Sequence, residues 1–114
     1  MIKRMIEKIK LWILSFKVWR EVTRNFMEET RGMDKQSREY LQIYKFNSYI
    51  KMSRVKITPY KIIVKIRIPE TFEGKRKVKE DWKAAVDLVA SMTDFKALSS
   101  DFTDKYYYTM TGTK

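Results

Sequence analysis

The sequence predicts an α+β protein in which a long N-terminal helix precedes a small two-layer domain of ββαββ type with an antiparallel sheet. Residues 2–30 contain neither proline nor glycine and are rich in strong helix formers. Two neighbouring segments, 51–57 and 60–68, alternate apolar and polar side chains as strands do, and residues 78–92 repeat apolar side chains at helical spacing. With 114 residues, 44% of them hydrophobic, the chain suits one small domain with or without an arm.

The N-terminal helix is expected over residues 1–31, with Gly32 just beyond its end. Its apolar stripe continues into the run 11–19, which is too short to span a bilayer. Three interpretations stay open for this run: packing in the core or on a partner, an exposed arm that folds on binding, or a position in a membrane interface. The candidate residues for contact with a partner or a membrane are Trp12, Leu14, Phe16 and Trp19.

Residues 32–38 are polar and are expected to form a linker, so that residues 39–114 make up the domain. The alternation in 40–46 favours a strand with a turn at 47–48, although a short helix at 38–46 is an alternative. In the strand 60–68, one face is apolar and the other is largely basic. The apolar face is formed by Ile62, Val64, Ile66 and Ile68, and the other by Lys61, Ile63, Lys65 and Arg67.

The second half of the domain begins after Pro69, which ends the strand 60–68. We expect a polar loop over 70–77, a helix over 78–92, a short strand over 95–98 and a turn over 101–104. The last strand is expected over 105–110, and its alternation places Tyr106 and Tyr108 on the face opposite Tyr107.

The net charge of +11 comes from 25 Lys and Arg residues against 14 Asp and Glu residues. Residues 1–67 hold 17 basic and 6 acidic residues, whereas residues 68–114 hold 8 of each, so the whole excess lies in the first part. Such an excess indicates a polyanionic partner. The absence of Cys and His, with only three glycines, argues against most enzymes, metal sites and phosphate-binding loops. We therefore expect no catalytic activity, no metal and no cofactor.

The strongest candidate site is a basic face on the two adjacent strands. Its predicted members are Lys51, Arg54, Lys56, Lys61, Lys65 and Arg67, and a second basic run precedes the helix at Lys75, Arg76 and Lys77. Cations and nearby tyrosines on a sheet can follow a phosphate backbone and stack bases. The alternative is an ordinary solvated face, because lysine is common on exposed strands.

The order of elements resembles the region ahead of the motor in FtsK/SpoIIIE-like DNA translocases, the coupling proteins of Gram-positive conjugative elements. The matching segments are the helix through Trp12, Trp19 and Arg24, the strands 52–57 and 60–68, the helix 78–92 and the closing strand 106–109. The chain has no Walker A motif, motor domain or membrane span of such proteins. The resemblance implies an accessory piece that acts on DNA near such a machine, and it carries over no functional residue.

These observations predict a small non-enzymatic nucleic-acid-binding accessory protein of a mobile element, plasmid or phage, with DNA favoured over RNA. The alternative is an interaction or scaffold protein whose N-terminal helix docks a partner, a second copy or a membrane surface. The expected location is cytoplasmic, with peripheral contact at the inner face of the membrane as an option.

Overall fold

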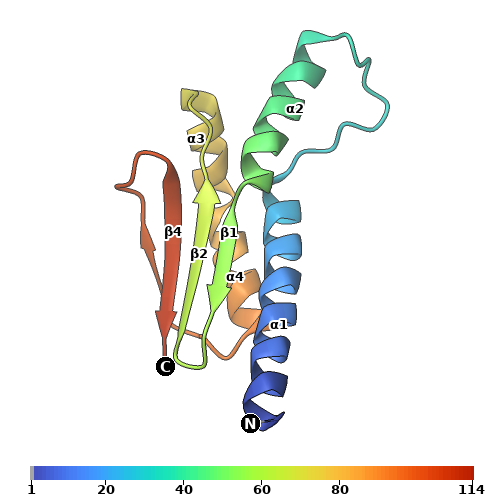
Figure 1. The fold of residues 1–114 in the computed structure, drawn as a ribbon. Helices are drawn as coiled ribbons and strands as arrows, with labels where there is room; N and C mark the ends of the chain where they lie inside the picture. Colours follow the sequence, from blue (N-terminus) through green and yellow to red (C-terminus); the bar gives the residue numbers. More distant parts are fainter. Residues whose placement is uncertain (1) are drawn as a thin grey trace.

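The computed structural model describes residues 2–114 and confirms the α+β class, with a long N-terminal helix and an antiparallel four-stranded sheet (Figure 1). The elements in chain order are α1 (Ile2–Phe26), α2 (Arg38–Lys51), β1 (Arg54–Ile57), β2 (Lys61–Arg67), α3 (Phe72–Glu80), α4 (Trp82–Met92), β3 (Leu98–Asp101) and β4 (Tyr107–Thr113). The strand order is β1-β2-β4-β3, so β1 and β3 are the edges.

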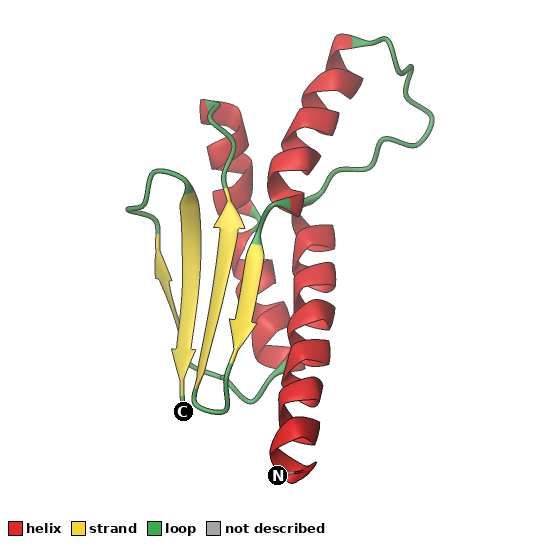
Figure 2. Ribbon diagram, in the orientation of Figure 1, coloured by secondary structure: helices red, strands yellow, loops and turns green. Residues whose placement is uncertain are grey.

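α1, α3 and α4 lie on one side of the sheet and leave most of its other face open, while Tyr49 of α2 reaches Arg67 at one end of that face. Figure 2 shows α3 and α4 behind the strands and α1 alongside β1, where α1 contacts both β1 and α4. α1 extends beyond the sheet at one end, while α2 projects at the other, and the molecule measures 54 × 28 × 22 Å. Within residues 2–114, no helix combines the length and apolar character needed to cross a lipid bilayer.

One hydrophobic core joins the helical layer to the sheet. The C-terminal half of α1 contributes Val18, Val22 and Phe26, all at most 1% exposed, to the same cluster as the strands. Trp82 of α4 packs near Phe26, and its indole Nε1–H donates to Ser100 Oγ of β3 at 2.8 Å. Residues 27–37 connect α1 to α2 where a linker was expected at 32–38, but the elements on both sides of this connection belong to one core.

The predicted register of the strand 60–68 is confirmed. Ile62, Val64 and Ile66 are fully buried, whereas Lys61 and Lys65 are exposed. β2 is central, because β1 pairs with it on one side and β4 on the other, both antiparallel. The alternation in the last strand is confirmed for Tyr107 and Tyr108, since Tyr108 is buried and Tyr107 lies on the opposite face. The placement of Tyr106 with Tyr108 is wrong, because Tyr106 precedes β4, is exposed, and lies beside Arg67 as Tyr107 does.

The strand predicted over 40–46 is wrong, because this segment lies in the helix α2. The helix begins at the Ser37 N-cap, whose side chain accepts a hydrogen bond from Tyr40 N. Ile43, Phe46 and Ile50 follow at helical spacing and are turned toward the rest of the molecule. The expected turn at 47–48 falls inside this helix, and Asn47 anchors it by exchanging two hydrogen bonds with the backbone of Glu28, at 3.0 and 3.1 Å.

The loop predicted over 70–77 is likewise wrong, since most of it forms α3. Thr71 caps this helix by accepting from Gly74 N at 3.1 Å. The helix predicted over 78–92 is divided at Asp81 into the end of α3 and the whole of α4. The short strand lies at Leu98–Asp101 instead of 95–98, because Phe95 is buried in the core ahead of it. α1 ends at Phe26, earlier than expected.

Candidate nucleic-acid interface

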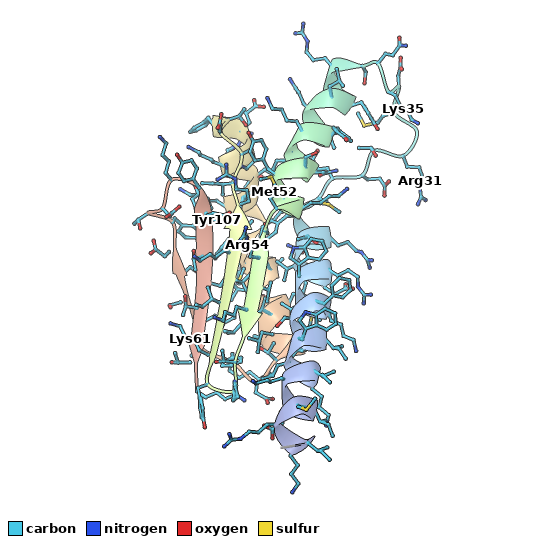
Figure 3. The ribbon with its side chains drawn as sticks, viewed as in Figure 1. Arg31, Lys35, Met52, Arg54, Lys61 and Tyr107 are labelled. Carbon is cyan, nitrogen blue, oxygen red and sulfur yellow. The ribbon has the colours of Figure 1, made fainter. Side chains whose placement is uncertain are left out.

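The open face of the sheet carries five of the predicted basic residues. Arg54 and Lys56 project from β1, and Lys61, Lys65 and Arg67 project from β2, because both strands bury their alternate residues. Figure 3 shows Arg54, Lys61 and Tyr107 on the side of the sheet away from α3 and α4. The neighbouring positions of β4 on this face are occupied by small hydroxyl residues, namely Thr109, Thr111 and Thr113.

The positive charges of this face outnumber the negative charges near them. Asp101 shares the face, because it lies opposite Thr109, and the Asp104 carboxylate, whose pKa is lowered mainly by hydrogen bonds from Tyr106 and Tyr107, is also influenced by the charge of Lys65. None of the five cations forms an ion pair with an acidic side chain of residues 2–114. Arg54 lies directly opposite Lys65 in the β1–β2 pairing, an arrangement that destabilises a sheet. Asp101 is on the far strand β3, where the hydroxyl group and then the backbone N–H of Thr103 donate to its carboxylate and lower its pKa.

Three tyrosines surround the guanidinium group of Arg67. Its Cζ atom lies 4.9 Å from the ring centroid of Tyr106, 5.5 Å from that of Tyr107 and 5.6 Å from that of Tyr49. The Nε atom is closed off from solvent and has no hydrogen-bond partner among residues 2–114. Lys65 approaches the same cluster, with its Nζ 6.0 Å from the Tyr107 ring. A cation and the aromatic ring beneath it attract each other. This arrangement therefore holds Arg67 and the tyrosines in place at one end of the basic face.

The turn before β4 is organised by Asp104. Its carboxylate accepts the backbone N–H groups of Tyr106 at 2.8 Å and of Tyr107 at 3.0 Å. These two hydrogen bonds stabilise the charged form and lower the pKa of Asp104. The side chain thereby fixes the start of the strand that presents two of the tyrosines around Arg67.

The remaining predicted cations lie elsewhere. Lys51 is the last residue of α2, not a strand residue. Lys75, Arg76 and Lys77 lie on α3 in the helical layer, because the segment folds as a helix. There Lys77 pairs with Glu28, and Arg76 pairs with Glu80 at 3.6 Å. The structure therefore does not bring these residues together with the open face.

The four predicted contact residues of the N-terminal helix divide into two pairs. Leu14 and Trp19 pack toward the domain, and the Trp19 indole Nε1–H donates to the backbone oxygen of Ser53 at 2.8 Å. Trp12 and Phe16 are 72% and 53% exposed. Both border a groove of about 350 Å³ between α1 and the edge strand β1, which Arg54 also lines.

The arrangement around Arg67 was not apparent from the sequence. In the sequence, Tyr49 lies just before the basic strands, whereas Tyr106–Tyr108 form a separate run near the other end of the chain. Their meeting depends on β4 pairing with β2, where Tyr107 lies opposite Arg67, and on residue 49 belonging to a helix. A sequence signal existed in the alternation, which places Arg67 and Tyr107 on one face once the two strands are neighbours. Comparison of the chain with family models, curated proteins and solved structures gives no match.

Proposed function

We propose that this protein binds nucleic acid, DNA in preference to RNA, through the open face of its sheet and without catalysing a reaction. The observation that carries the proposal is a set of five cations on one face of the sheet that form no ion pair within residues 2–114. Four of them are exposed, and Arg67 is half-buried among three tyrosines at one end. The repulsion between Arg54 and Lys65, which lie directly opposite each other, destabilises the free protein. A polyanion bound over the face would neutralise both charges. The net charge of +11 agrees with such a partner.

The dimensions of the face fit a nucleic-acid backbone. From Lys61 to Arg67, β2 spans about 20 Å at the usual rise of a strand. This distance corresponds to about six base-pair steps along the axis of a duplex. The half-buried Tyr107 lies at the end of this row and offers a ring edge or face to a base.

The likeness in element order to the region ahead of the motor in conjugative coupling proteins supports the choice of DNA. On this proposal the chain is an accessory protein of a mobile element, plasmid or phage. Binding would be governed by phosphates and so would show little preference for sequence.

The proposal is tested by fluorescence anisotropy with labelled single- and double-stranded DNA and with RNA of the same sequence, over a series of salt concentrations. About five phosphate contacts give a plot of log K against log salt with a slope of about −4 on duplex DNA. The variant Arg54→Gln/Lys61→Gln/Lys65→Gln removes three of these contacts and should reduce the slope by about 3 units.

A matched control loses the same charge away from the sheet. Arg31→Gln/Lys35→Gln/Lys83→Gln alters two residues of the α1–α2 connection, labelled in Figure 3, and one exposed residue of α4. This variant should retain most of the slope. A flat salt dependence, absence of binding at low salt, or equal losses in the two triple variants would overturn the proposal.

A further inference from the structure

The N-terminal half of α1 carries an apolar stripe that nothing in residues 2–114 covers. The stripe repeats at intervals of three and four residues, so that its members lie along one side of the helix. They are Ile2, Met5, Ile6, Ile9, Trp12, Ile13 and Phe16, each between 41% and 75% exposed. Contiguous exposed apolar surface of this kind marks a contact with something else.

Most of this stripe faces away from the domain, while Trp12 and Phe16 at its end border the groove beside β1. Ile9 and the fully buried Val18 are nine residues apart, which is two and a half helical turns, and they therefore point in opposite directions. The core-facing side of α1 is formed by Leu11, Leu14, Val18 and Val22. The same helix thus packs on its own domain with one side and leaves the other side free.

The free side is bordered by positive charge. Lys3, Lys10 and Lys17 follow at intervals of seven residues, so they line one border of the stripe, and Lys8 lies at the other. All of them are exposed, as is Arg4, and Glu7 is the one acidic residue between positions 2 and 20. Cations beside an apolar face with Trp and Phe are the features of helices that lie in an anionic membrane interface.

We propose that residues 2–17 of α1 bind the surface of an anionic lipid membrane, with the apolar stripe inserted at the level of the headgroups. A second copy of the chain is the less favourable occupant. It would bring an equally basic segment against this one, so that like charges would meet along both borders of the stripe. A lipid surface with negative headgroups complements both the stripe and its borders.

The test is flotation of the full chain with vesicles of phosphatidylcholine mixed with phosphatidylglycerol, and with vesicles of phosphatidylcholine alone. We expect binding to the mixed vesicles to be at least about tenfold stronger, because several cations lie near the surface. Met5→Gln/Ile9→Gln/Trp12→Gln should abolish flotation. These side chains are exposed and glutamine is a good helix former, so the fold should be retained.

The matched control is Leu41→Gln/Tyr44→Gln/Met52→Gln, which removes three comparably exposed apolar side chains from α2 and the residue after it. This control should float as the unchanged chain does. Trp12 fluorescence, obtained as the difference from a Trp12→Phe variant, should shift to shorter wavelength on mixed vesicles as the indole leaves water.

Several results would overturn the proposal. Absence of flotation would exclude a lipid partner, and light scattering would then show whether a dimer covers the stripe. Loss of flotation in Arg54→Gln/Lys61→Gln/Lys65→Gln, but not in the α1 variant, would show that vesicles bind the sheet. The α1 variant should also keep its affinity for DNA, so the membrane proposal and the DNA proposal fail separately.

Discussion

At the scale of single residues, the two charges of Arg54 and Lys65 affect the stability of the fold and would also affect the proposed binding of a polyanion. The two side chains are exposed and directly opposite on neighbouring strands. Like charges at such positions repel one another, but solvent screens the repulsion between exposed groups. On the proposed function, the same two charges would both attract a polyanion, so the pair would favour binding at the expense of the folded state.

We therefore predict that Lys65→Gln raises stability slightly while it weakens DNA binding. The expected gain is about 0.2–0.5 kcal/mol in the free energy of unfolding, measured by urea denaturation at low salt. The salt slope for DNA should fall by about 1 unit. Lys83→Gln, on the exposed side of α4, serves as the control and should change neither quantity. A loss of stability in Lys65→Gln would show that the repulsion is compensated.

Some residues of the candidate site could be placed from the sequence, and others could not. Lys61 and Lys65 could be placed on the open face because alternation in one strand depends only on that strand. The surroundings of Arg67 could not be predicted in this way, because Tyr49, Tyr106 and Tyr107 come from segments that are far apart along the chain. Such contacts depend on the strand order, about which a single strand carries no information.

At the scale of elements, the segments that were misjudged have local patterns compatible with more than one structure. Residues 40–46 alternate like a strand, but the helix is decided by the Ser37 cap and by the burial of Ile50. Gly74 favoured a loop in the prediction, but it lies inside α3. A glycine is required at this position because the helix passes close to Pro69. A Cβ atom at position 74 would lie 2.7 Å from the Cβ of Pro69. Tertiary packing overrides local preference in both cases.

Gly112 in β4 shows the same dependence on packing. A Cβ atom there would lie 2.7 Å from Leu98 Cδ2 and 3.0 Å from Ile62 Cγ2, in the buried layer. We predict that Gly112→Ala destabilises the protein by about 1–3 kcal/mol because the core would be overpacked. Thermal and urea denaturation measure the loss, and Thr113→Ala, at the next and exposed position, is the control. An unchanged unfolding midpoint in Gly112→Ala would show that Leu98 moves aside freely.

At the scale of the whole molecule, α1 is a structural part of the domain. Val18, Val22 and Phe26 are almost completely buried against the other elements. Each is worth about 1.5–3 kcal/mol of burial, and their sum is comparable to the total stability of a small protein. The boundary expected at 32–38 was placed on the composition of the chain, which carries no information about what a helix packs against.

We predict that a chain beginning at Asp34 fails to fold, whereas a chain beginning at Leu11 folds. The shorter deletion removes only exposed residues of α1 among those described, and the longer one removes its whole contribution to the core. Circular dichroism and the dispersion of amide proton shifts distinguish the outcomes. Cooperative unfolding of the chain from Asp34 would contradict the prediction and would show that the sheet and α4 suffice.

The packing of α1 also bears on how the molecule would be oriented once attached. One straight helix carries the free apolar stripe on one side and core residues on the other, with no hinge between them. A molecule held through that stripe would have little rotational freedom, because turning the helix turns the whole domain. Attachment through the stripe would fix the rotation of α1 about its own axis, and it would thereby fix the direction in which the basic face of β1 and β2 points. A protein attached in this way would present its open sheet face at a defined angle, whereas a protein on a flexible tether would rotate freely.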